Sequence, residues 1–539
     1  MIGADAIVKC LEKENVEVLF GYPGVAICPF FNSILNTDIE AILVRTEQNA
    51  AHAASGYARV TGKVGVCVAT SGPGATNLIT GIATAYADSI PLVCFTGQVD
   101  SKLLGYDTFQ EADITGAVES FVKYSYLVRD VKDLPRIIKE AFHIASTGRK
   151  GPVLIDLPMD IQNSPISKFE YPEEVNLRTY KPTVKGHAVQ IKKVMNELAK
   201  CKRPIICCGG GVLLSDARKE LRDFAHRFNI PVVSTLMGIS AMPTNDPLYF
   251  GMVGNNGKYY ANKAMNESDL LIMIGARVAD RAVSQPDLIT NNKVLVHIDV
   301  DPAEIGKQVG PHIPLVGDIK HIFNDIEKEE GFDNNFSEWV NTLYSYKEQA
   351  PKRKAPSKDY VDPAEFIRLL SEKMDDDAIY VADVGQNQMW SCGYYVSKNG
   401  RFLTSGGMGT MGYSIPAAMG AKRADKSRQV VAVCGDGSFQ MSFMELATMQ
   451  QYKIPTKIFI FHNGYLGLVR EYQHNTYKAN YSVVDLTGSP DFSHIAKAYD
   501  MEFTCLKNME NIESEISRIL SFDGPMLVEV MIDPMDTVK

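Results

Sequence analysis

Several features that would each point to a particular class of protein are missing from this sequence. Its ten cysteines include no pair with the spacing of a zinc site, and no stretch approaches the roughly twenty apolar residues of a membrane span. The basic residues are scattered through a chain of net charge -9, which excludes a nucleic-acid-binding stripe and a polybasic membrane anchor. Charged residues interrupt positions 1–21, so these lack the apolar centre of a signal peptide. We therefore expect a cytoplasmic protein with buried, reduced thiols that acts on small molecules.

The 539 residues are too many for one hydrophobic core and predict about three domains. Hydrophobic residues make up 45% of the chain, so the supply of apolar side chains does not limit burial. Two polar, proline-bearing stretches at 166–185 and 346–360 have the composition of linkers. The sequence thus predicts domains at residues 1–165, 186–345 and 361–539.

Short apolar runs alternate with helical stretches in all three predicted domains. This alternation is typical of a parallel, doubly wound sheet, so we expect an α/β fold with one such sheet in each domain. In such sheets ligands bind outside the carboxyl ends of the strands. The predicted strands are 16–20, 41–45, 64–70, 91–97 and 152–158, then 203–211, 231–235, 269–277 and 294–301, and finally 378–385, 429–437 and 457–463.

A Gly-Asp-Gly turn at 435–437 is separated from Asn463 by one predicted helix and one apolar strand. A crossover of that length brings both ends to the same edge of a parallel sheet, so Asp436 and Asn463 can meet at one metal ion. Carboxylate and amide oxygens suit Mg²⁺, which usually keeps diphosphate oxygens in its other positions. The glycines leave the backbone open, and amides from Ser438 onward can face phosphate. Taken alone, the tripeptide is equally compatible with an ordinary acidic turn.

Glu47 follows the strand predicted at 41–45, and a Gly-Pro-Gly turn at 72–74 follows the strand predicted at 64–70. An isolated glutamate in this position is typically a carboxylate stabilised by the dipole at the start of a helix. The neighbouring turn, which leaves its backbone exposed, favours a ligand site instead.

Four segments carry a resemblance to a known family: 44–59 (VRTEQNAAHAASGYAR), 68–99, 107–116 (DTFQEADITG) and 435–463. With these motifs the chain closely resembles the thiamine-diphosphate enzymes, specifically the catalytic subunit of acetolactate synthase, nearly from end to end. The resemblance implies the thiamine-diphosphate enzyme fold, with pyrimidine-binding, central and diphosphate-binding domains in that order.

The resemblance implies a catalytic role for Glu47. In that family the matching glutamate hydrogen-bonds N1′ of the coenzyme's pyrimidine, so the exocyclic nitrogen becomes basic enough to deprotonate thiazolium C2. The carbanion attacks pyruvate, carbon dioxide leaves, and the thiazolium serves as the electron sink. Phe109, Gln110 and Lys123 match substrate-handling residues: Gln110 would donate to a developing alkoxide and Phe109 would close the pocket against water. A solvated surface lysine is the alternative interpretation of Lys123.

The resemblance also assigns residues to the coenzyme and its metal. Met411 matches the methionine wedge beneath the bent coenzyme, and the backbone of Gly409 and Met411 would bind the pyrimidine. The implied magnesium ligands are Asp436, Asn463 and the backbone oxygen of Tyr465.

The diphosphate would be contacted by Gln386, Asn387, Gly437 and Ser438. Since Gln386 and Asn387 follow a predicted strand, a contact is favoured, but both are also compatible with surface-loop amides.

The predicted central domain resembles the part of acetolactate synthases that binds FAD, a flavin not needed for net redox chemistry. Each of its motifs alone is a common turn at a strand end, but together they occur in the family's order. The flavin-binding residues implied are Gly209, Gly210, Gly211, Gly275, Arg277, Asp280, Arg281, Asp299 and Asp318.

The chain departs from the family at several positions near the implied sites. Glu47, Asp436 and Asn463, which are expected to activate and hold the coenzyme, are kept. The departures therefore bear on the choice of acceptor and on flavin binding. A smaller side chain at position 472 predicts a weaker preference for 2-oxobutanoate over pyruvate as acceptor. The departures are Val25 for glycine, Thr46 for histidine, Met159 for lysine, Asn255 and Asn256 for a Met-His pair, Asn387 for histidine, His462 for asparagine and Tyr472 for tryptophan.

We therefore expect a carboligase dependent on thiamine diphosphate and magnesium, with FAD, that converts pyruvate and a second 2-oxo acid into 2-acetolactate for branched-chain amino acid synthesis. Transfer to another acceptor, such as a keto-sugar nucleotide, and simple decarboxylation remain open, as does a non-catalytic, cofactor-binding paralogue. Family members place Glu47 and Asp436 of different subunits on one coenzyme, which implies a homodimer or homotetramer. A regulatory small subunit is a further possible partner.

Overall fold

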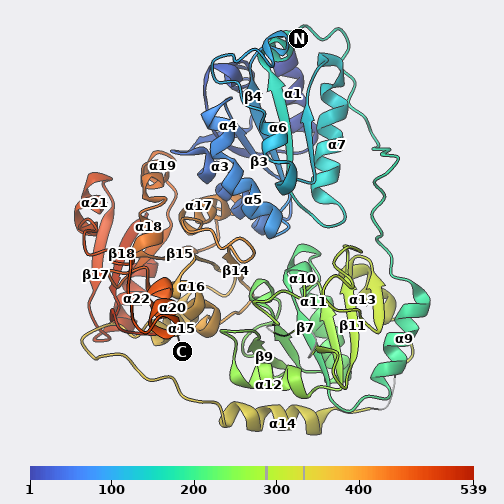
Figure 1. Ribbon diagram of the computed structural model, residues 1–539. Coiled ribbons are helices and arrows are strands. Elements are labelled where there is room, and N and C mark those ends of the chain that lie inside the picture. The colour runs from blue at the N-terminus through green and yellow to red at the C-terminus, as the bar shows by residue number, and fades with distance from the viewer. Residues whose placement is uncertain (284, 286–288, 332–333, 539) are drawn as a thin grey trace.

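The computed structural model describes residues 1–283, 285, 289–331 and 334–538. In these ranges the chain forms three sheets of six strands, and every pair of neighbouring strands is parallel (Figure 1). We call the three sheets with their helices the N-terminal, central and C-terminal lobes. The prediction of three doubly wound parallel sheets is confirmed.

The N-terminal lobe is a sheet with helices on both faces. Its strands are β1 (Val18–Tyr22), β2 (Glu40–Leu43), β3 (Gly65–Ala69), β4 (Leu92–Gln98), β5 (Tyr124–Leu127) and β6 (Val153–Pro158), in the order β2-β1-β3-β4-β6-β5. Its longer helices are α1 (Gly3–Lys13), α2 (Cys28–Ile34), α3 (Glu47–Thr61), α5 (Ile79–Ala87) and α7 (Leu134–Ser146). Successive strand residues face opposite layers, so Val66 packs with α1, α2 and α7 while Cys67 packs with α3 and α5. Shorter helices are α4 (Pro73–Asn77), α6 (Ile114–Ala117) and α8 (Met159–Asn163).

The central lobe repeats this plan around a single large core. Its strands are β7 (Pro204–Cys208), β8 (Val232–Ser234), β9 (Tyr249–Met252), β10 (Leu270–Ile274), β11 (Val294–Asp299) and β12 (Ile313–Val316), in the order β12-β11-β10-β7-β8-β9. Every residue of β7 and β10 is buried, because these strands are covered on both faces. Its helices are α9 (Ala188–Leu198), α10 (Gly210–Leu214), α11 (Arg218–Phe228), α12 (Tyr259–Glu267), α13 (Ile319–Ile326) and α14 (Ser337–Glu348).

The C-terminal lobe has the strand order β14-β13-β15-β16-β18-β17. Its strands are β13 (Ile379–Ala382), β14 (Arg401–Thr404), β15 (Val430–Gly435), β16 (Lys457–His462), β17 (Glu502–Leu506) and β18 (Met526–Met531). Its helices are α15 (Pro363–Lys373), α16 (Gln386–Tyr394), α17 (Ser414–Ala424), α18 (Asp436–Phe439), α19 (Leu446–Gln451), α20 (Gly467–Thr476), α21 (Phe492–Ala498) and α22 (Ile512–Ser521). The predicted single helix between β15 and β16 is thus broken into α18, a 3₁₀ turn at Phe443–Glu445 and α19.

Helices α3 and α17 join the N-terminal and C-terminal lobes. Glycines make the close approach possible: a Cβ on Gly56 would lie 2.0 Å from the Ala417 carbonyl oxygen, and one on Gly420 would lie 1.8 Å from the Ala53 carbonyl oxygen. Because Glu47 begins α3, this contact fixes its position relative to the C-terminal lobe of the same chain.

The segments 166–187 and 349–362 form neither a helix nor a named strand. They run along the outside of the molecule between the lobes (Figure 1). The domain boundaries set there from the sequence remain predictions.

Two expectations from composition can be compared with the structure. Cys28 is exposed at the start of α2, so the expectation of buried thiols is wrong there, whereas seven other cysteines are buried and Cys201 and Cys505 are half-buried. In the part of the chain that the structure describes, no helix combines the length and apolar character needed to cross a bilayer.

Candidate functional site

The structure brings Asp436 and Asn463 together at the carboxyl edge of the C-terminal sheet. They follow β15 and β16, which are neighbouring parallel strands. Asp436 Oδ2 accepts a hydrogen bond of 2.7 Å from Gly464 N, and Asn463 Oδ1 accepts one of 3.0 Å from Tyr465 N. The crossover between the two strands therefore ends where the sequence predicted a metal site.

Asp436 has the electrostatic character of a cation ligand. It is buried, and burial raises the pKa of its carboxyl, while the amides of Gly464 and Gly437 only partly offset that effect. Its nearest basic side chain is that of His462, whose Nε2 lies 3.9 Å away and whose Nδ1 is held by Glu529 at 2.6 Å. A buried carboxylate with so weak a partner fits a divalent cation.

Gln386 and Asn387 are both buried at the start of α16. Gln386 Oε1 accepts from Asn463 Nδ2 at 3.0 Å, and its Nε2 donates to Glu471 Oε2 at 3.0 Å. Asn387 Nδ2 donates to the carbonyl oxygens of Asp383 and Val433 at 2.9 and 3.2 Å. The alternative that these two are surface-loop amides is wrong.

Ser438 and Gly437 lie in the same turn. The Ser438 hydroxyl accepts a hydrogen bond from Gly435 N at 3.0 Å and so stabilises the turn. A Cβ on Gly437 would lie 2.9 Å from Leu466 Cδ2 and 3.6 Å from Met411 Cε, so the glycine lets these side chains pack closely on the turn. Met411 therefore borders this turn, as its expected role requires.

The loop that carries Gly409 and Met411 is held by a residue that sequence reasoning missed. Asp383 is fully buried and accepts from Gly412 N at 2.9 Å and from Ser414 N at 2.8 Å. Gly409 and Gly412 have φ of +69° and +85°, in the left-handed region that favours glycine. The available signal was that Asp383 is the first polar residue after β13.

Glu47 lies buried at the carboxyl edge of the N-terminal sheet, as the first residue of α3. Asn77 Nδ2 donates to its Oε2 at 2.9 Å, and Gly74 lies against its Oε1, where a Cβ would be 3.2 Å away. Gly24 and Gly74 both press on Thr70, whose buried hydroxyl has no hydrogen bond among the described residues. Asn77 and Thr70 were not predicted from the sequence.

Gln110 lies at the same edge of the N-terminal sheet, whereas the neighbouring Phe109 is exposed. A Cβ on Gly72 would lie 2.9 Å from Gln110 Cβ, so this residue packs directly on the Gly-Pro-Gly turn. The Phe109 side chain is 85% exposed. The expected role of Phe109 in shutting out water therefore stays a prediction, since its ring is exposed in the single chain.

The hydrogen bonds of Lys123 go to a different part of the N-terminal lobe from those of Glu47. Its Nζ donates to the Thr147 carbonyl and the Tyr180 hydroxyl, both at 2.8 Å, and to the Ile144 carbonyl. Burial lowers its pKa to about 7. The alternative of a solvated lysine is wrong, and the ammonium group binds carbonyl oxygens at the end of α7.

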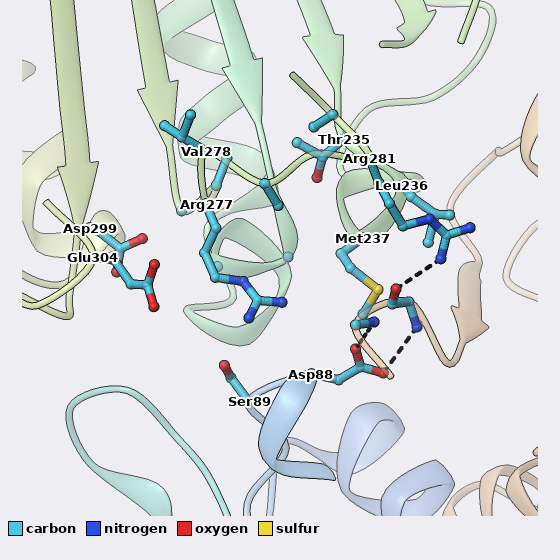
Figure 2. A pocket seen from close by; sticks show the side chains of 18 of the residues that line it. Asp88, Ser89, Thr235, Leu236, Met237, Arg277, Val278, Arg281, Asp299 and Glu304 are labelled. Carbon is cyan, nitrogen blue, oxygen red and sulfur yellow. Dashed lines mark hydrogen bonds between the residues drawn. The ribbon is translucent and has the colours of Figure 1, made fainter. Parts of the chain in front are cut away.

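A cavity of about 510 Å³ lies where the three lobes meet (Figure 2). Its walls come from Ala87–Ser89 and Gly148–Lys150 of the N-terminal lobe, from most strand ends of the central lobe, and from Met389, Gly406 and Gly407 of the C-terminal lobe. The residues predicted for FAD that line it are Gly210, Gly211, Gly275, Arg277, Asp280, Arg281, Asp299 and Asp318.

Gly209 does not line the cavity but allows its floor to form. A Cβ on Gly209 would lie 2.2 Å from the Gly275 carbonyl oxygen, and one on Gly211 would lie 2.6 Å from Gly275 Cα. Arginines cross between lobes around the rim: Arg277 donates to the Ala87 carbonyl at 2.9 Å, and Arg149 pairs with Glu304 at 2.7 Å. The cavity is thus enclosed by residues of three lobes that are bonded to one another at its rim.

Three family models of the thiamine pyrophosphate enzymes match the chain: the N-terminal TPP binding domain over residues 1–117, the central domain over 191–326 and the C-terminal TPP binding domain over 383–530. The chain is 44% identical to the probable acetolactate synthase large subunit of Methanococcus aeolicus, covering 100% of this chain and 93% of that protein. It is 42% identical to the acetolactate synthase large subunit of Lactococcus lactis (99% and 93% covered) and 40% identical to that of Haemophilus influenzae (99% and 95%). The chain belongs to the acetolactate synthase large-subunit family.

Within this family the two TPP binding models fall on the lobes that carry Glu47 and Asp436. The contacts of Glu47 all come from the N-terminal lobe, and those of Asp436 from the C-terminal lobe. The third model falls on the lobe that contributes most of the cavity wall.

Four of the residues at which the chain departs from the family can now be placed. Asn255 and Asn256 line the interlobe cavity, and Asn256 Nδ2 lies 3.1 Å from Met389 Sδ. Tyr472 and Val25 are 59% and 73% exposed, on the C-terminal and N-terminal lobes respectively.

Proposed function

We propose that the protein is a carboligase dependent on thiamine diphosphate and magnesium, which decarboxylates pyruvate and joins the two-carbon unit to a second 2-oxo acid to give 2-acetolactate. The observation that carries the proposal is the pair of buried carboxylates, Glu47 and Asp436, at strand ends in the two lobes that match TPP binding models. Identity of 40–44% with acetolactate synthase large subunits over nearly the whole chain supports the product.

Thiamine diphosphate, when bound, supplies a nucleophilic carbon and an electron sink for the decarboxylation of a 2-oxo acid. Glu47 would hold a proton at the coenzyme's pyrimidine nitrogen through Oε1, since Oε2 is engaged by Asn77. Because Glu47 is buried beside Gly74, water is kept from that proton. Gly409 and Met411 would orient the pyrimidine.

On the C-terminal lobe, Asp436, Asn463 and the Tyr465 carbonyl would hold Mg²⁺. The diphosphate would lie along Gly437 and Ser438 at the end of β15, with the amides Gln386 and Asn387 beside it. Gln110 would donate a hydrogen bond to the oxygen of the substrate. Of the three predicted substrate-handling residues, Gln110 alone packs on the Gly-Pro-Gly turn, and this position supports its role.

Each site would be completed by a second copy of the chain. Glu47 and Asp436 must reach one small coenzyme, yet Glu47 is hydrogen-bonded by the N-terminal lobe and Asp436 by the C-terminal lobe. Large apolar side chains are exposed on both lobes, including Phe109 (85%) and Val25 on one and Val483 (94%) on the other. A homodimer, alone or paired into a tetramer, would cover these surfaces and let Phe109 close the partner's site. A regulatory small subunit is a further possible partner.

The interlobe cavity would hold FAD without net redox chemistry. Its volume of about 510 Å³ is in the range of cofactor sites, and eight residues that the family resemblance implies converge on it. The glycines at 209 and 211 let the loops that follow β7 and β10 pack closely together beneath it.

Product analysis tests the function directly. Purified protein is given pyruvate, Mg²⁺, thiamine diphosphate and FAD, and the products are followed by proton NMR. Acetolactate is the expected product, and Glu47→Gln should abolish its formation while the protein stays folded. Acetaldehyde alone would favour a decarboxylase, product only after adding a keto-sugar nucleotide would favour another acceptor, and tight coenzyme binding without turnover would favour a non-catalytic paralogue.

A further inference from the structure

A short segment of the C-terminal lobe, residues 404–410, is held between the other two lobes where they border the interlobe cavity. In Figure 2 the Asp88 carboxylate points at its main chain and accepts from Gly406 N at 3.2 Å and Gly407 N at 2.7 Å. From the central lobe, Arg281 Nη1 donates to the Gly406 carbonyl oxygen at 3.0 Å. The peptide group between Gly406 and Gly407 is thus hydrogen-bonded to both neighbouring lobes.

Two glycines let the neighbouring lobes pack closely against this segment. A Cβ on Gly406 would lie 2.2 Å from Met237 Sδ, and a Cβ on Gly407 would lie 2.8 Å from the Ala87 carbonyl oxygen. Met237 and Ala87 are both walls of the cavity. Because close-packed groups transmit displacement, a ligand that sets these walls also sets the segment.

Asp88 is itself rigidly placed. Its side chain is fully buried and pairs with Arg59 Nη2 at 2.6 Å, while Arg59 Nη1 donates to the Thr404 carbonyl oxygen at 2.9 Å. A buried carboxylate is tolerated where an arginine and backbone amides satisfy it, and here those amides belong to the segment.

The segment leads directly into the pyrimidine-binding residues. At its end, Thr410 Oγ1 shares a hydrogen bond of 2.6 Å with Thr84 Oγ1, and Thr410 N donates to Ser405 Oγ at 3.0 Å. Gly409 lies within the segment and Met411 follows it. The position of both therefore depends on how the N-terminal and central lobes hold residues 404–410.

We propose that Asp88 is a positioning residue that couples the interlobe cavity to the coenzyme site: FAD in the cavity and thiamine diphosphate on the C-terminal lobe each strengthen the binding of the other by fixing residues 404–410. This inference rests on the proposed function, since it takes Gly409 and Met411 as the pyrimidine contacts. It gives a reason for an enzyme without net redox chemistry to keep a flavin. By thermodynamic linkage the coupling is reciprocal, so each ligand changes the affinity of the other by the same factor.

The test is a linkage measurement on the full-length protein. Isothermal titration gives the Kd of thiamine diphosphate with Mg²⁺ in flavin-free protein and in protein saturated with FAD, and the Kd of FAD with and without the coenzyme. The wild type should show the same ratio in both directions, in the range of about 5- to 150-fold that coupled sites display. In Asp88→Asn the amide cannot accept from both glycines and loses its charge beside Arg59, so the ratio should fall to about one.

Two further variants separate coupling from damage to the fold. Thr84→Val removes the hydroxyl bond to Thr410, together with a bond to the Thr80 carbonyl within α5, and leaves the cavity lining intact. It should therefore lower the ratio without changing the Kd of FAD alone. Ser215→Ala is the matched control: Ser215 lines the cavity and binds Asp318 at 2.7 Å, away from the segment. It should weaken FAD and keep the wild-type ratio.

The outcomes distinguish this inference from the function beneath it. A ratio of one in the wild type, no FAD binding, or an unchanged ratio in both Asp88→Asn and Thr84→Val would overturn the coupling while leaving the carboligase proposal standing. Failure of the wild type to bind thiamine diphosphate with Mg²⁺ would overturn the proposed function, and the coupling with it.

Discussion

Glu445 of the C-terminal lobe accepts a hydrogen bond of 2.9 Å from Asn49 Nδ2, two residues beyond Glu47 in α3. The same oxygen accepts from Arg45 N at 2.8 Å, and the other oxygen accepts from Thr448 Oγ1 at 2.7 Å. Glu445 is fully buried, and burial raises the pKa of its carboxyl. The residue proposed to activate the coenzyme is thus flanked by two groups that the chain's own C-terminal lobe holds in place.

Replacing Glu445 by alanine should therefore lower both stability and activity. The change leaves the Asn49 amide and the Arg45 N–H without an acceptor in a dry interface, at a cost of about 1–3 kcal/mol for each group. We expect a lower midpoint of thermal unfolding, and slower acetolactate formation even below that midpoint. Thr448→Val is the control, since it removes one bond to Glu445 and spares both groups beside Glu47. A Glu445→Ala variant with wild-type rate and midpoint would show that this contact does not position α3.

Lys123→Met should affect stability rather than catalysis. The ammonium group binds the Thr147 and Ile144 carbonyls at the end of α7, and its loss removes both charge-assisted bonds and leaves the Tyr180 hydroxyl as the remaining donor to Thr147. We expect a lower unfolding midpoint with an unchanged KM for pyruvate. A KM that rises several-fold while the midpoint stays constant would restore Lys123 to the substrate site.

Asp156 should make the stability of the protein depend on pH. It is buried, and burial raises its pKa to about 7, although Thr96 and Gln98 donate to it. The folded state therefore holds this proton more tightly than the unfolded chain, whose aspartate titrates near 4. Stability from this group is fully present below the unfolded value and is lost as pH rises to about 7, by up to about 1.4 kcal/mol for each pH unit.

The measurement is the unfolding midpoint at several pH values from 5 to 8. In Asp156→Asn, which cannot ionise, the fall in midpoint over that interval should be smaller than in the wild type. Identical pH profiles for the two proteins would mean that Asp156 is ionised throughout.

Tyr472→Trp should alter the choice of acceptor. Tyr472 replaces the tryptophan found in the family and is 59% exposed in the single chain. A pocket change of this size typically shifts discrimination by about 1–3 kcal/mol. In competition between pyruvate and 2-oxobutanoate, the Tyr472→Trp variant should form relatively more product from 2-oxobutanoate. A strong 2-oxobutanoate preference already present in the wild type would contradict this expectation.

The sequence predicted interior strands far better than strands at sheet edges. The runs at 64–70 and 91–97 correspond to β3 and β4, which are buried on both faces and so read as continuous apolar stretches. Five strands that were not predicted, β5, β9, β12, β14 and β17, all lie at sheet edges. There one side meets solvent and the apolar pattern is diluted, as in β5, where no residue is fully buried. The interior strand β18 was also not predicted, because Glu529, which binds His462, interrupts its apolar sequence pattern.

The candidate site could be predicted where residues follow strands directly and not where distant segments meet. Asp436 was found because it follows a strand end, and Glu47 because the Gly-Pro-Gly turn and the family resemblance add to its place after a strand. Asn77, Asp383 and Asp88 were missed because their partners are set by the fold: Asp88, for example, bonds Gly407, which is 319 positions away. The spacing of motifs carries no information about such contacts.

The most direct test of the account mixes two inactive chains. Glu47→Gln and Asp436→Asn should each abolish acetolactate formation as homodimers. If one coenzyme is held by Glu47 of one chain and Asp436 of the other, co-expressing the two variants yields mixed dimers in which one of the two sites is intact. Random pairing then predicts recovery of about one quarter of the wild-type specific activity. No recovery, with mixed dimers shown to be present by differently tagged chains, would contradict a site shared between two chains.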